Sequence, residues 1–308
     1  MKGLELSENY FCDLGLPMIK ENFPHYVDRI AAGLVGDGSE CFGFDDEISQ
    51  DHDWGPSFCV WLTAEDFKTI GQALQEEIMK LPQSYGGFSP RKVSDWGAGR
   101  VGVFEISQFY SNFIGQNTIP PQLQDWLFIP EDALAACTNG KVFCDPLGEF
   151  SKWRQKLLEF YPEDIRLKKM ASRCMTIAQS GQYNFQRCIQ RKEYFAAQYA
   201  ETKFCADVIS MIFLLNRRYT PFNKWMHRAL KNLLLLGRII HQKITEIVTS
   251  KDYTRKFALI EEICGIIIDE LKNQELSDSK SSFLLDHGPQ IQNKIKDSQL
   301  RQRNVWIG

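Results

Sequence analysis

The distribution of glycine and proline divides this chain of 308 residues into two parts with different folding patterns. Up to about residue 150, glycines and prolines interrupt short apolar runs. Between Lys152 and Leu271 both residues are rare, and apolar positions recur at helical spacing. Because glycine and proline break helices, only the second part suits long helices. The length also suits two domains of about 150 residues each, so we predict domains at 1–150 and 151–308.

The first part is predicted to alternate strands with a helix. Short β-like runs lie at residues 30–35, 58–62 and 101–106. Between the last two, apolar residues recur at helical spacing over residues 64–81, namely Phe67, Ile70, Leu74, Ile78 and Leu81. A further helix up to Gly140 and a short apolar run at 142–144 follow. The alternation predicts an α/β or α+β domain.

The second part is predicted to be an all-α helical bundle. At least five helices fit its pattern, and four of them cover residues 165–179, 185–216, 224–249 and 253–271. The polar tail after Ser277 is expected to be partly loose, up to a last helix or an anchor near Trp306.

Composition restricts the class of protein. The apolar fraction of 44% and the charged fraction of 24% are those of a globular chain. No secretory signal and no apolar run of membrane-spanning length is apparent, so no membrane partner is expected. The nine cysteines form no CxxC pair and no zinc spacing with histidine. An odd, scattered set of cysteines favours a cytoplasmic protein.

Charge is divided unevenly between the two parts. Residues 1–150 hold 9 Lys and Arg against 23 Asp and Glu, a net charge of −14, whereas residues 151–308 hold 27 against 16, a net charge of +11. One interpretation is a cleft that holds metal ions on its acidic wall and steers anionic phosphates with its basic wall. The alternative is that the two parts simply attract each other.

The turn GDGS follows the first predicted strand. Such a turn can open a helix whose free backbone amides bind a phosphate, with Ser39 capping the helix and offering a hydroxyl after Gly38. No Gly-Lys-Ser/Thr follows, so it is not a Walker loop. A plain tight turn is the alternative.

Two carboxylates stand close together at the start of the next apolar run. If the chain is extended there, Asp51 and Asp53 point the same way, whereas His52 and Trp54 point the other way. Paired hard oxygen ligands suit Mg²⁺ and the two-metal arrangement of phosphoryl and nucleotidyl transfer. Alternatively, both belong to a solvated acidic loop that begins at Asp45.

A two-metal site normally needs a third carboxylate on a neighbouring strand. Glu105 stands in the apolar stretch VGVFEISQ, where a charge needs a partner or a metal. The alternative places Glu105 on the solvated face of an edge strand. Asp95 and Asp145 are weaker candidates because both stand in loop-like contexts.

These residues resemble a known signature. The signature of the nucleotidyltransferase superfamily is hydrophobic-Gly-Ser, a spaced glycine and Asp-x-Asp, and the corresponding residues here are Gly38, Ser39, Gly43, Asp51 and Asp53. The run DWLFIPEDALAACTNGKVFCDPLGEF is similar to the continuation in kanamycin- and lincosamide-type and minimal nucleotidyltransferases. The phrase GSECFGFDDEISQDHDWG, with GQYN and PFNKW, resembles the domain of unknown function 4037 family, a branch of that superfamily. The resemblance covers roughly residues 5–230.

The resemblance implies a fold and a site. The fold is α+β, a nucleotidyltransferase-like (polymerase-beta-like) mixed sheet with helices, followed by the helical bundle. A nucleoside triphosphate, expected to be ATP, would lie at Gly38 and Ser39, with two Mg²⁺ ions on Asp51, Asp53 and Glu105. Many relatives have a basic residue directly after the Gly-Ser pair.

This chain has Glu40 after the Gly-Ser pair, so cations from elsewhere must balance the triphosphate. The candidates are Arg187 and Arg191, four apart on one helix face, and Lys224. They could instead be ordinary surface cations.

The resulting hypothesis is a magnesium-dependent nucleotidyltransferase. It would transfer a nucleoside monophosphate, expected to be AMP, to a hydroxyl of a small molecule, a protein or an RNA end, and release pyrophosphate. The alternative is a nucleotide-binding regulatory protein with a degenerate catalytic site, which Glu40 motivates. The basic part lacks a compact Lys/Arg run with interleaved aromatics, so the nucleic-acid signature is not strong.

Overall fold

The computed structural model describes residues 1–95 and 97–308, which form two compact units. The first unit contains Met1–Ile119 and Ala133–Glu159, and the second contains Pro120–Asp132 and Phe160–Gly308. The predicted boundary, residue 150, falls inside helix α7 (Glu149–Leu158). That helix belongs to the first unit because the ring of Phe150 stacks on Trp61, with 3.7 Å between the ring centroids.

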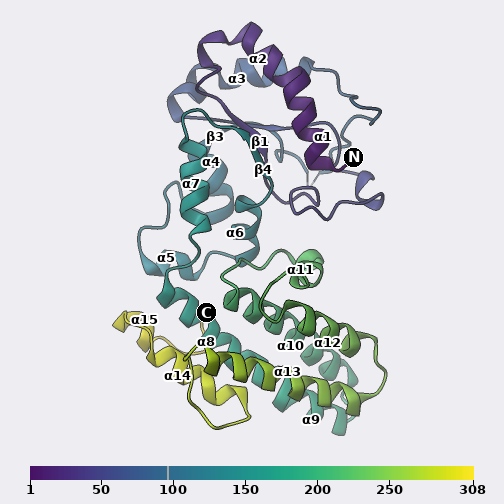
Figure 1. The fold of residues 1–308 in the computed structure, drawn as a ribbon, viewed down its shortest axis with the longest axis vertical. Helices are drawn as coiled ribbons and strands as arrows, with labels where there is room; N and C mark the ends of the chain where they lie inside the picture. The colour runs from purple at the N-terminus through teal and green to yellow at the C-terminus, as the bar shows by residue number, and fades with distance from the viewer. Residues whose placement is uncertain (96) are drawn as a thin grey trace. The chain divides into compact units, whose positions relative to one another are not determined.

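A sheet of four short strands forms the centre of the first unit (Figure 1). The strands are β1 (Ala31–Leu34), β2 (Cys59–Leu62), β3 (Gly102–Glu105) and β4 (Lys141–Cys144). Their order is β3-β2-β1-β4, with β1 antiparallel to β2 and to β4, and β2 parallel to β3. The sequence prediction of an α+β fold with a mixed sheet is confirmed.

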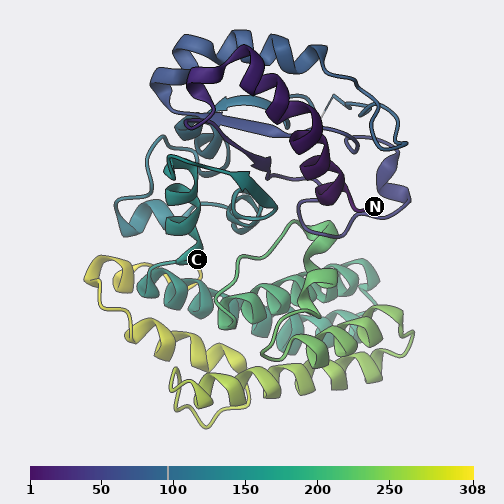
Figure 2. The same ribbon diagram turned by 45° about the horizontal axis from the view of Figure 1, so that its top comes forward.

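The inner strand β2 alternates its side chains between two layers of helices. Phe58, Val60 and Leu62 are buried among residues from the helices at the N-terminus and from α3. These helices are α1 (Gly3–Tyr10), π-helical η1 (Phe11–Gly15), α2 (Leu16–Asn22) and α3 (Ala64–Lys80). Figure 2 shows the purple N-terminal helices lying over one face of the sheet. The predicted helix at 64–81 is thus α3, and the side chain of Thr63 caps it by accepting the amide of Asp66.

Aromatic side chains fill the layer on the other face of the sheet. Trp61 of β2 lies between Phe150 of α7 and Phe109 of α4 (Ile106–Ile114), whose ring centroid is 5.4 Å away. Tyr110 stacks on Trp153 at 5.0 Å. Helix α6 (Glu131–Thr138) precedes β4, as the sequence predicted. Two 3-10 turns complete this unit, η2 (Pro24–Tyr26) and η3 (Ile48–Gln50).

The second unit is helical throughout the described part of residues 120–132 and 160–308. Its elements are α5 (Leu123–Leu127), α8 (Glu163–Ile177), η4 (Ala178–Phe185), α9 (Gln186–Gln190), α10 (Tyr194–Leu215), α11 (Asn223–Leu230), α12 (Gly237–Thr249), α13 (Tyr253–Asn273), η5 (Leu284–His287), α14 (Gly288–Asn293) and α15 (Ser298–Gln302). The predicted helix 224–249 is two helices, because Leu236 adopts a left-handed φ of 60°. The predicted helix 185–216 begins in a π-helix and breaks before Tyr194.

The polar tail is packed, and the prediction that it is partly loose was wrong. Ile291 and Leu300 have no exposed surface. The ammonium group of Lys168 on α8 donates to the side-chain oxygen of Gln292 at 2.7 Å and to the carbonyl of Asn304 at 2.8 Å. The tail is therefore held by a few buried apolar side chains, although most of its residues are polar. Across the described residues, no helix is both long enough and apolar enough to cross a membrane.

Candidate functional site

Four segments of the first unit meet at one end of the sheet, where β1 ends and β2, β3 and β4 begin. Gly33 at the end of β1 pairs with Cys59 at the start of β2, which pairs with Gly102 at the start of β3. The start of β4 pairs with the end of β1. The turn 36–40 after β1 and the segments before the other three strands therefore gather at one end of the sheet. We call this the strand-end site, and its residues are Gly36, Gly38, Ser39, Glu40, Asp51, Asp53, Arg91, Ser94, Arg100 and Asn139.

The Gly-Ser turn is compact and opens no helix, so of the two interpretations the structure has the plain tight turn. The carbonyl of Ser39 accepts the amide of Phe44 at 2.9 Å, and residues 36–43 form bends and turns. The side chain of Asn139 accepts the amide of Gly36 at 3.0 Å and donates to its carbonyl at 2.7 Å. Gly36 has a φ of 142°, which residues with a side chain rarely adopt. The turn is thus fixed in place from the segment before β4.

Asp51 and Asp53 are not extended and differ in their surroundings. Asp51 follows the 3-10 turn η3 in a helical conformation, and its carboxylate is 62% exposed, 2.7 Å from the ring of His52. Asp53 has a left-handed φ of 51° and is 7% exposed. The extended conformation that would align both carboxylates is therefore absent here, because the chain turns at both residues.

The carboxylate of Asp53 is held by the loop before β3. It accepts the backbone amide of Ser94 at 2.9 Å and also the Ser94 hydroxyl. The guanidinium of Arg100 lies 3.6 Å away. A side chain at Gly97 would overlap the carboxylate, since a Cβ there would lie 1.7 Å from Oδ1. Burial alone would raise the pKa of Asp53, but the Ser94 hydrogen bonds and Arg100 outweigh it and lower this pKa.

A buried ion pair lies beside the turn. The carboxylate of Glu40 is 3.4 Å from the guanidinium of Arg91, and the two side chains are 4% and 7% exposed. Arg91 also donates to the hydroxyl of Ser57 at 3.0 Å, while its Nε, among the described residues, has no hydrogen-bond partner. Burial raises the pKa of Glu40 despite the nearby cation. Arg91 and Glu40 therefore balance each other's charge beside the turn.

The acidic loop is only partly solvated. Asp45 is 3% exposed and accepts the backbone amide of Gly3 at 2.8 Å, and the indole of Trp54 donates to it at 3.3 Å. Its carboxylate therefore joins the N-terminus of α1 to the loop. Asp46, Glu47 and Asp51 of the same loop are exposed.

Glu105 lies on the strand next to β2, as predicted, but at its far end. It pairs with Leu62, three residues or about 10 Å beyond the Cys59–Gly102 pair. Its carboxylate accepts the amides of Ser107 at 2.9 Å and Gln108 at 2.8 Å, which caps helix α4. The charge thus has a helix N-terminus as its partner. The expected convergence of Glu105 with Asp51 and Asp53 is contradicted by this register.

The arrangement of the candidate carboxylates decides whether they can bind Mg²⁺. Over residues 1–95 and 97–308, no group of three or more His, Cys, Asp or Glu side chains could hold a metal ion. Three carboxylates holding two ions therefore do not fit this arrangement. Asp51 fits one ion, since its carboxylate is exposed and Mg²⁺ binds through one or two carboxylates together with substrate phosphates. Asp53 fits as a second ligand only after exchanging its contacts with Ser94.

The three cations predicted for the triphosphate lie in the second unit. Arg187 is on α9 with its guanidinium 4.8 Å from the ring centroid of Tyr183, and Arg191 is the residue that caps the end of that helix. Lys224 is on α11, with its ammonium 5.0 Å from the ring centroid of Trp225. Gly38, Ser39 and the acidic residues lie in the first unit, so a shared site stays a prediction.

Two cations of the first unit were missed by the sequence reasoning. Arg91 and Arg100 stand in SPRKVSDWGAGR, the segment that leads into β3. Their signal is weak because an arginine in a loop is ordinarily a surface residue. Only the parallel pairing of β2 with β3 brings them beside Glu40 and Asp53.

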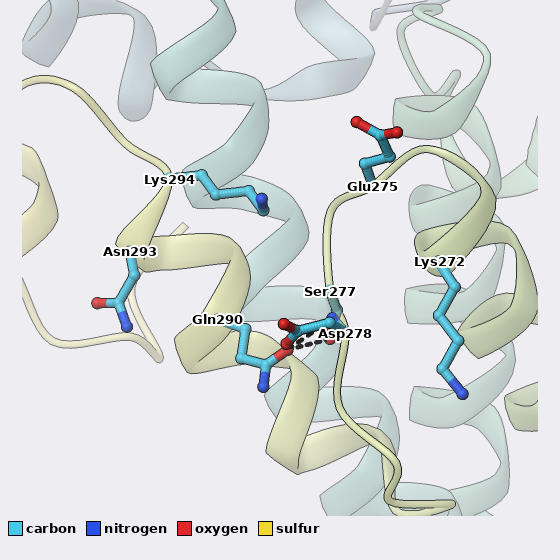
Figure 3. Close-up of a pocket in the computed structure, with 7 residues that line it drawn as sticks. All are labelled: Lys272, Glu275, Ser277, Asp278, Gln290, Asn293 and Lys294. Atoms are coloured by element: carbon cyan, nitrogen blue, oxygen red, sulfur yellow. Dashed lines mark hydrogen bonds between the residues drawn. The ribbon is translucent and has the colours of Figure 1, made fainter.

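A polar cavity of about 640 Å³ lies in the second unit, near α13 and α14 (Figure 3). The side-chain oxygen of Gln290 in its wall accepts the hydroxyl of Ser277 and the amide of Asp278. In Figure 3 the ammonium groups of Lys272 and Lys294 point to different sides. The two ammonium groups therefore do not converge on one anion, and we do not assign a site to this cavity.

Comparison with known proteins identifies one family model. The model of the domain of unknown function DUF4037 matches residues 126–226, which confirms the predicted resemblance over that part of the chain. A crystal structure of a nucleotidyltransferase-like protein from Exiguobacterium sibiricum 255-15 is similar with a TM-score of 0.36 and 9% identity, over 91% of this chain and 89% of that chain. No curated protein matches the sequence.

Proposed function

We propose that the chain is a nucleotidyltransferase. It binds a nucleoside triphosphate, expected to be ATP, at the strand-end site and transfers its nucleoside monophosphate to a hydroxyl of an acceptor. The acceptor is a small molecule, a protein or an RNA end. The observation that carries the proposal is the meeting of the Gly38-Ser39 turn with Asp51, Asp53 and Arg100 at one end of the sheet.

The residues of the site have separate tasks in this proposal. The hydroxyl of Ser39 and the amides of the turn contact phosphate oxygens, and Asn139 keeps the turn in position. The guanidinium of Arg100, 31% exposed, is available to balance phosphate charge. Asp51 would hold the metal through its exposed carboxylate, and Asp53 would be its second ligand in place of the contacts with Ser94.

Mg²⁺ is the cofactor of this proposal, and when bound it neutralises charge on the phosphates and polarises the bond to be broken. Glu105 is not assigned as its ligand, because both oxygens of that carboxylate cap α4. Transfer breaks the bond between the α-phosphorus and its bridging oxygen, forms a bond to the acceptor hydroxyl and releases pyrophosphate. The proton of that hydroxyl is lost to solvent water as the bond forms.

A second candidate function is nucleotide binding for regulation, without transfer. It is favoured by the engagement of Asp53 with Ser94 and of Glu105 with α4, which leaves Asp51 as the exposed carboxylate of the three. The two candidates differ in one product, since only the enzyme releases pyrophosphate.

The assay incubates the full chain with each of four labelled nucleoside triphosphates and Mg²⁺, with and without cell extract. Pyrophosphate and the label are followed together. Label found on a small molecule, protein or RNA identifies the acceptor class. Saturable binding without transfer in any extract supports the regulatory candidate and contradicts the enzyme.

A further inference from the structure

A second cavity of about 480 Å³ opens within the helical unit, between η4 and α10. Its volume lies in the range of small-molecule sites, roughly 300–1,000 Å³. One wall comes from η4 through Gln179, Ser180 and Asn184, and the facing wall comes from α10 through Phe195, Tyr199 and Lys203. All of these residues belong to the second unit. We call this cavity the η4–α10 pocket.

The π-helix brings two side-chain amides into the same cavity. Gln179 and Asn184 are five residues apart, and in an α-helix that spacing separates two side chains by about 140° around the axis. In a π-helix, residues five apart are hydrogen-bonded along the axis and so lie nearly one above the other. The eight residues Ala178–Phe185 have this geometry. Such segments are rare and are frequent at functional sites.

Within residues 1–95 and 97–308 these two amides have no hydrogen-bond partner, unlike a third amide on the same segment. Among the described residues, neither the Gln179 nor the Asn184 side chain makes a hydrogen bond. The Gln182 amide is fully engaged, because it donates to Glu261 at 2.8 Å and to the carbonyl of Ser282 at 3.0 Å, and it accepts the amide of Leu284 at 2.8 Å. Each amide in the pocket thus offers a donor and an acceptor to a ligand.

The facing wall offers aromatic surface and little net charge. Phe195 is 84% exposed and Tyr199 is 66% exposed, and the two are four residues apart on one face of α10. Lys203 continues this face, but its ammonium is 2.7 Å from the carboxylate of Asp207, which neutralises it. Exposed rings favour a planar aromatic partner. A neutralised lysine disfavours a phosphate group.

We propose that the η4–α10 pocket binds a neutral small molecule with a planar heteroaromatic ring of the nucleobase type. The ring stacks on Phe195 and Tyr199, and its hydrogen-bonding edge meets the amides of Gln179 and Asn184. This site is separate from the strand-end site and does not depend on nucleotidyl transfer. It gives the helical unit a ligand-binding role of its own.

In the test, the full chain is titrated with adenosine and with uridine. Binding is measured by calorimetry and by ligand-observed NMR. The Asn184→Leu variant removes the amide at nearly constant size, and affinity should fall about tenfold. Phe195→Ala should also weaken binding about tenfold through lost stacking. The matched control is Gln198→Leu, which makes the same chemical change on α10 outside the pocket and should leave affinity unchanged.

Thermal unfolding separates loss of a ligand contact from loss of structure. Asn184→Leu should leave the melting temperature unchanged because the native amide has no partner, whereas Gln182→Leu should lower it. A loss of affinity in Asn184→Leu and Phe195→Ala, with none in Gln198→Leu, assigns the bound nucleoside to the pocket and not to the strand-end site. The proposal is overturned if neither nucleoside binds saturably at millimolar concentration, or if Asn184→Leu and Phe195→Ala both bind as the unmodified chain does.

Discussion

The carboxylate of Asp53 accepts both the backbone amide and the hydroxyl of Ser94, which follows it by 41 residues in the chain. This contact joins the loop before β2 to the loop before β3. It occupies an acid that the Asp-x-Asp motif would assign to metal binding. The carboxylate of Asp53 is therefore engaged by the protein itself, and its contacts can be tested directly.

Replacing Ser94 with alanine should weaken the fold in a manner that depends on pH. The lost hydrogen bond to an ionised group should lower the free energy of unfolding by about 1.5 kcal/mol at neutral pH. The folded-state pKa of Asp53 lies below its ordinary value of 3.8, so its contribution is present above that pH and is lost as pH falls through the folded pKa. Urea unfolding from neutral pH down to about pH 3 should show the two proteins converging.

The control for this experiment is Ser84→Ala. Ser84 is exposed and precedes the loop that contains Ser94. Its replacement should leave the free energy of unfolding unchanged at every pH. An equal effect of Ser94→Ala at every pH would contradict the link between the hydroxyl and the Asp53 charge.

Removing one partner of the buried Glu40–Arg91 pair should destabilise the fold more than removing both. Arg91→Met leaves a buried carboxylate without its cation and should lower the free energy of unfolding by about 3 kcal/mol at neutral pH. Because burial raises the folded pKa of Glu40, the penalty should shrink as pH falls and Glu40 takes up a proton. The double variant Glu40→Gln with Arg91→Met should recover much of the loss. A double-variant loss equal to the sum of the two single losses would show that the groups are not coupled.

Glu105 should behave as a helix cap. Glu105→Ala should lower the free energy of unfolding by about 1 kcal/mol, because α4 loses the acceptor of two amides. Glu105→Asp should keep most of the stability, since aspartate also caps helices. Neither change should abolish nucleotidyl transfer in the folded protein. A loss of transfer to background in both variants, with stability unchanged, would restore Glu105 as a metal ligand.

Lys168 should anchor the C-terminal segment of the second unit. Lys168→Met removes hydrogen bonds to Gln292 and to the carbonyls of Arg303 and Asn304. Hydrogen exchange should then become faster at the amides of residues 303–308 than at those of α13. Unchanged protection of that segment would show that Ile291 and Leu300 hold the tail without the lysine.

Periodicity predicted the elements whose side chains face a continuous core. The apolar run at 58–62 and the helical spacing over 64–81 correspond to β2 and α3, because both patterns record buried positions. The run is continuous because β2 is buried on both faces, whereas α3 is buried on one side through Ile70 and Leu74. The bundle was predicted for the same reason. The π-helix at Ala178–Phe185 was not, since its apolar pattern continues that of α8 and a wider turn leaves no mark in composition.

The place of the candidate residues along the chain relative to the strands could be read from the sequence, but their conformation could not. The sequence placed Ser39 after one apolar run and Asp51 and Asp53 before the next, and in the structure these runs are β1 and β2, which pair antiparallel. The left-handed φ of Asp53 and its bond to Ser94 depend on a loop far along the chain, and no local pattern records such a contact. Glu105 was predicted to lie beside the aspartates because an apolar run does not show which end of its strand is near the site.

The most direct test of the central claim measures pyrophosphate release by the full chain with Mg²⁺ and the acceptor-containing extract, comparing Asp51→Asn, Asp53→Asn and Glu47→Gln. Glu47 is an exposed acid of the same loop and controls for general loss of negative charge. The account predicts release by the unmodified chain and by Glu47→Gln, and none by either aspartate variant while circular dichroism shows both folded. Undiminished release by the double variant Asp51→Asn with Asp53→Asn would contradict the nucleotidyltransferase assignment.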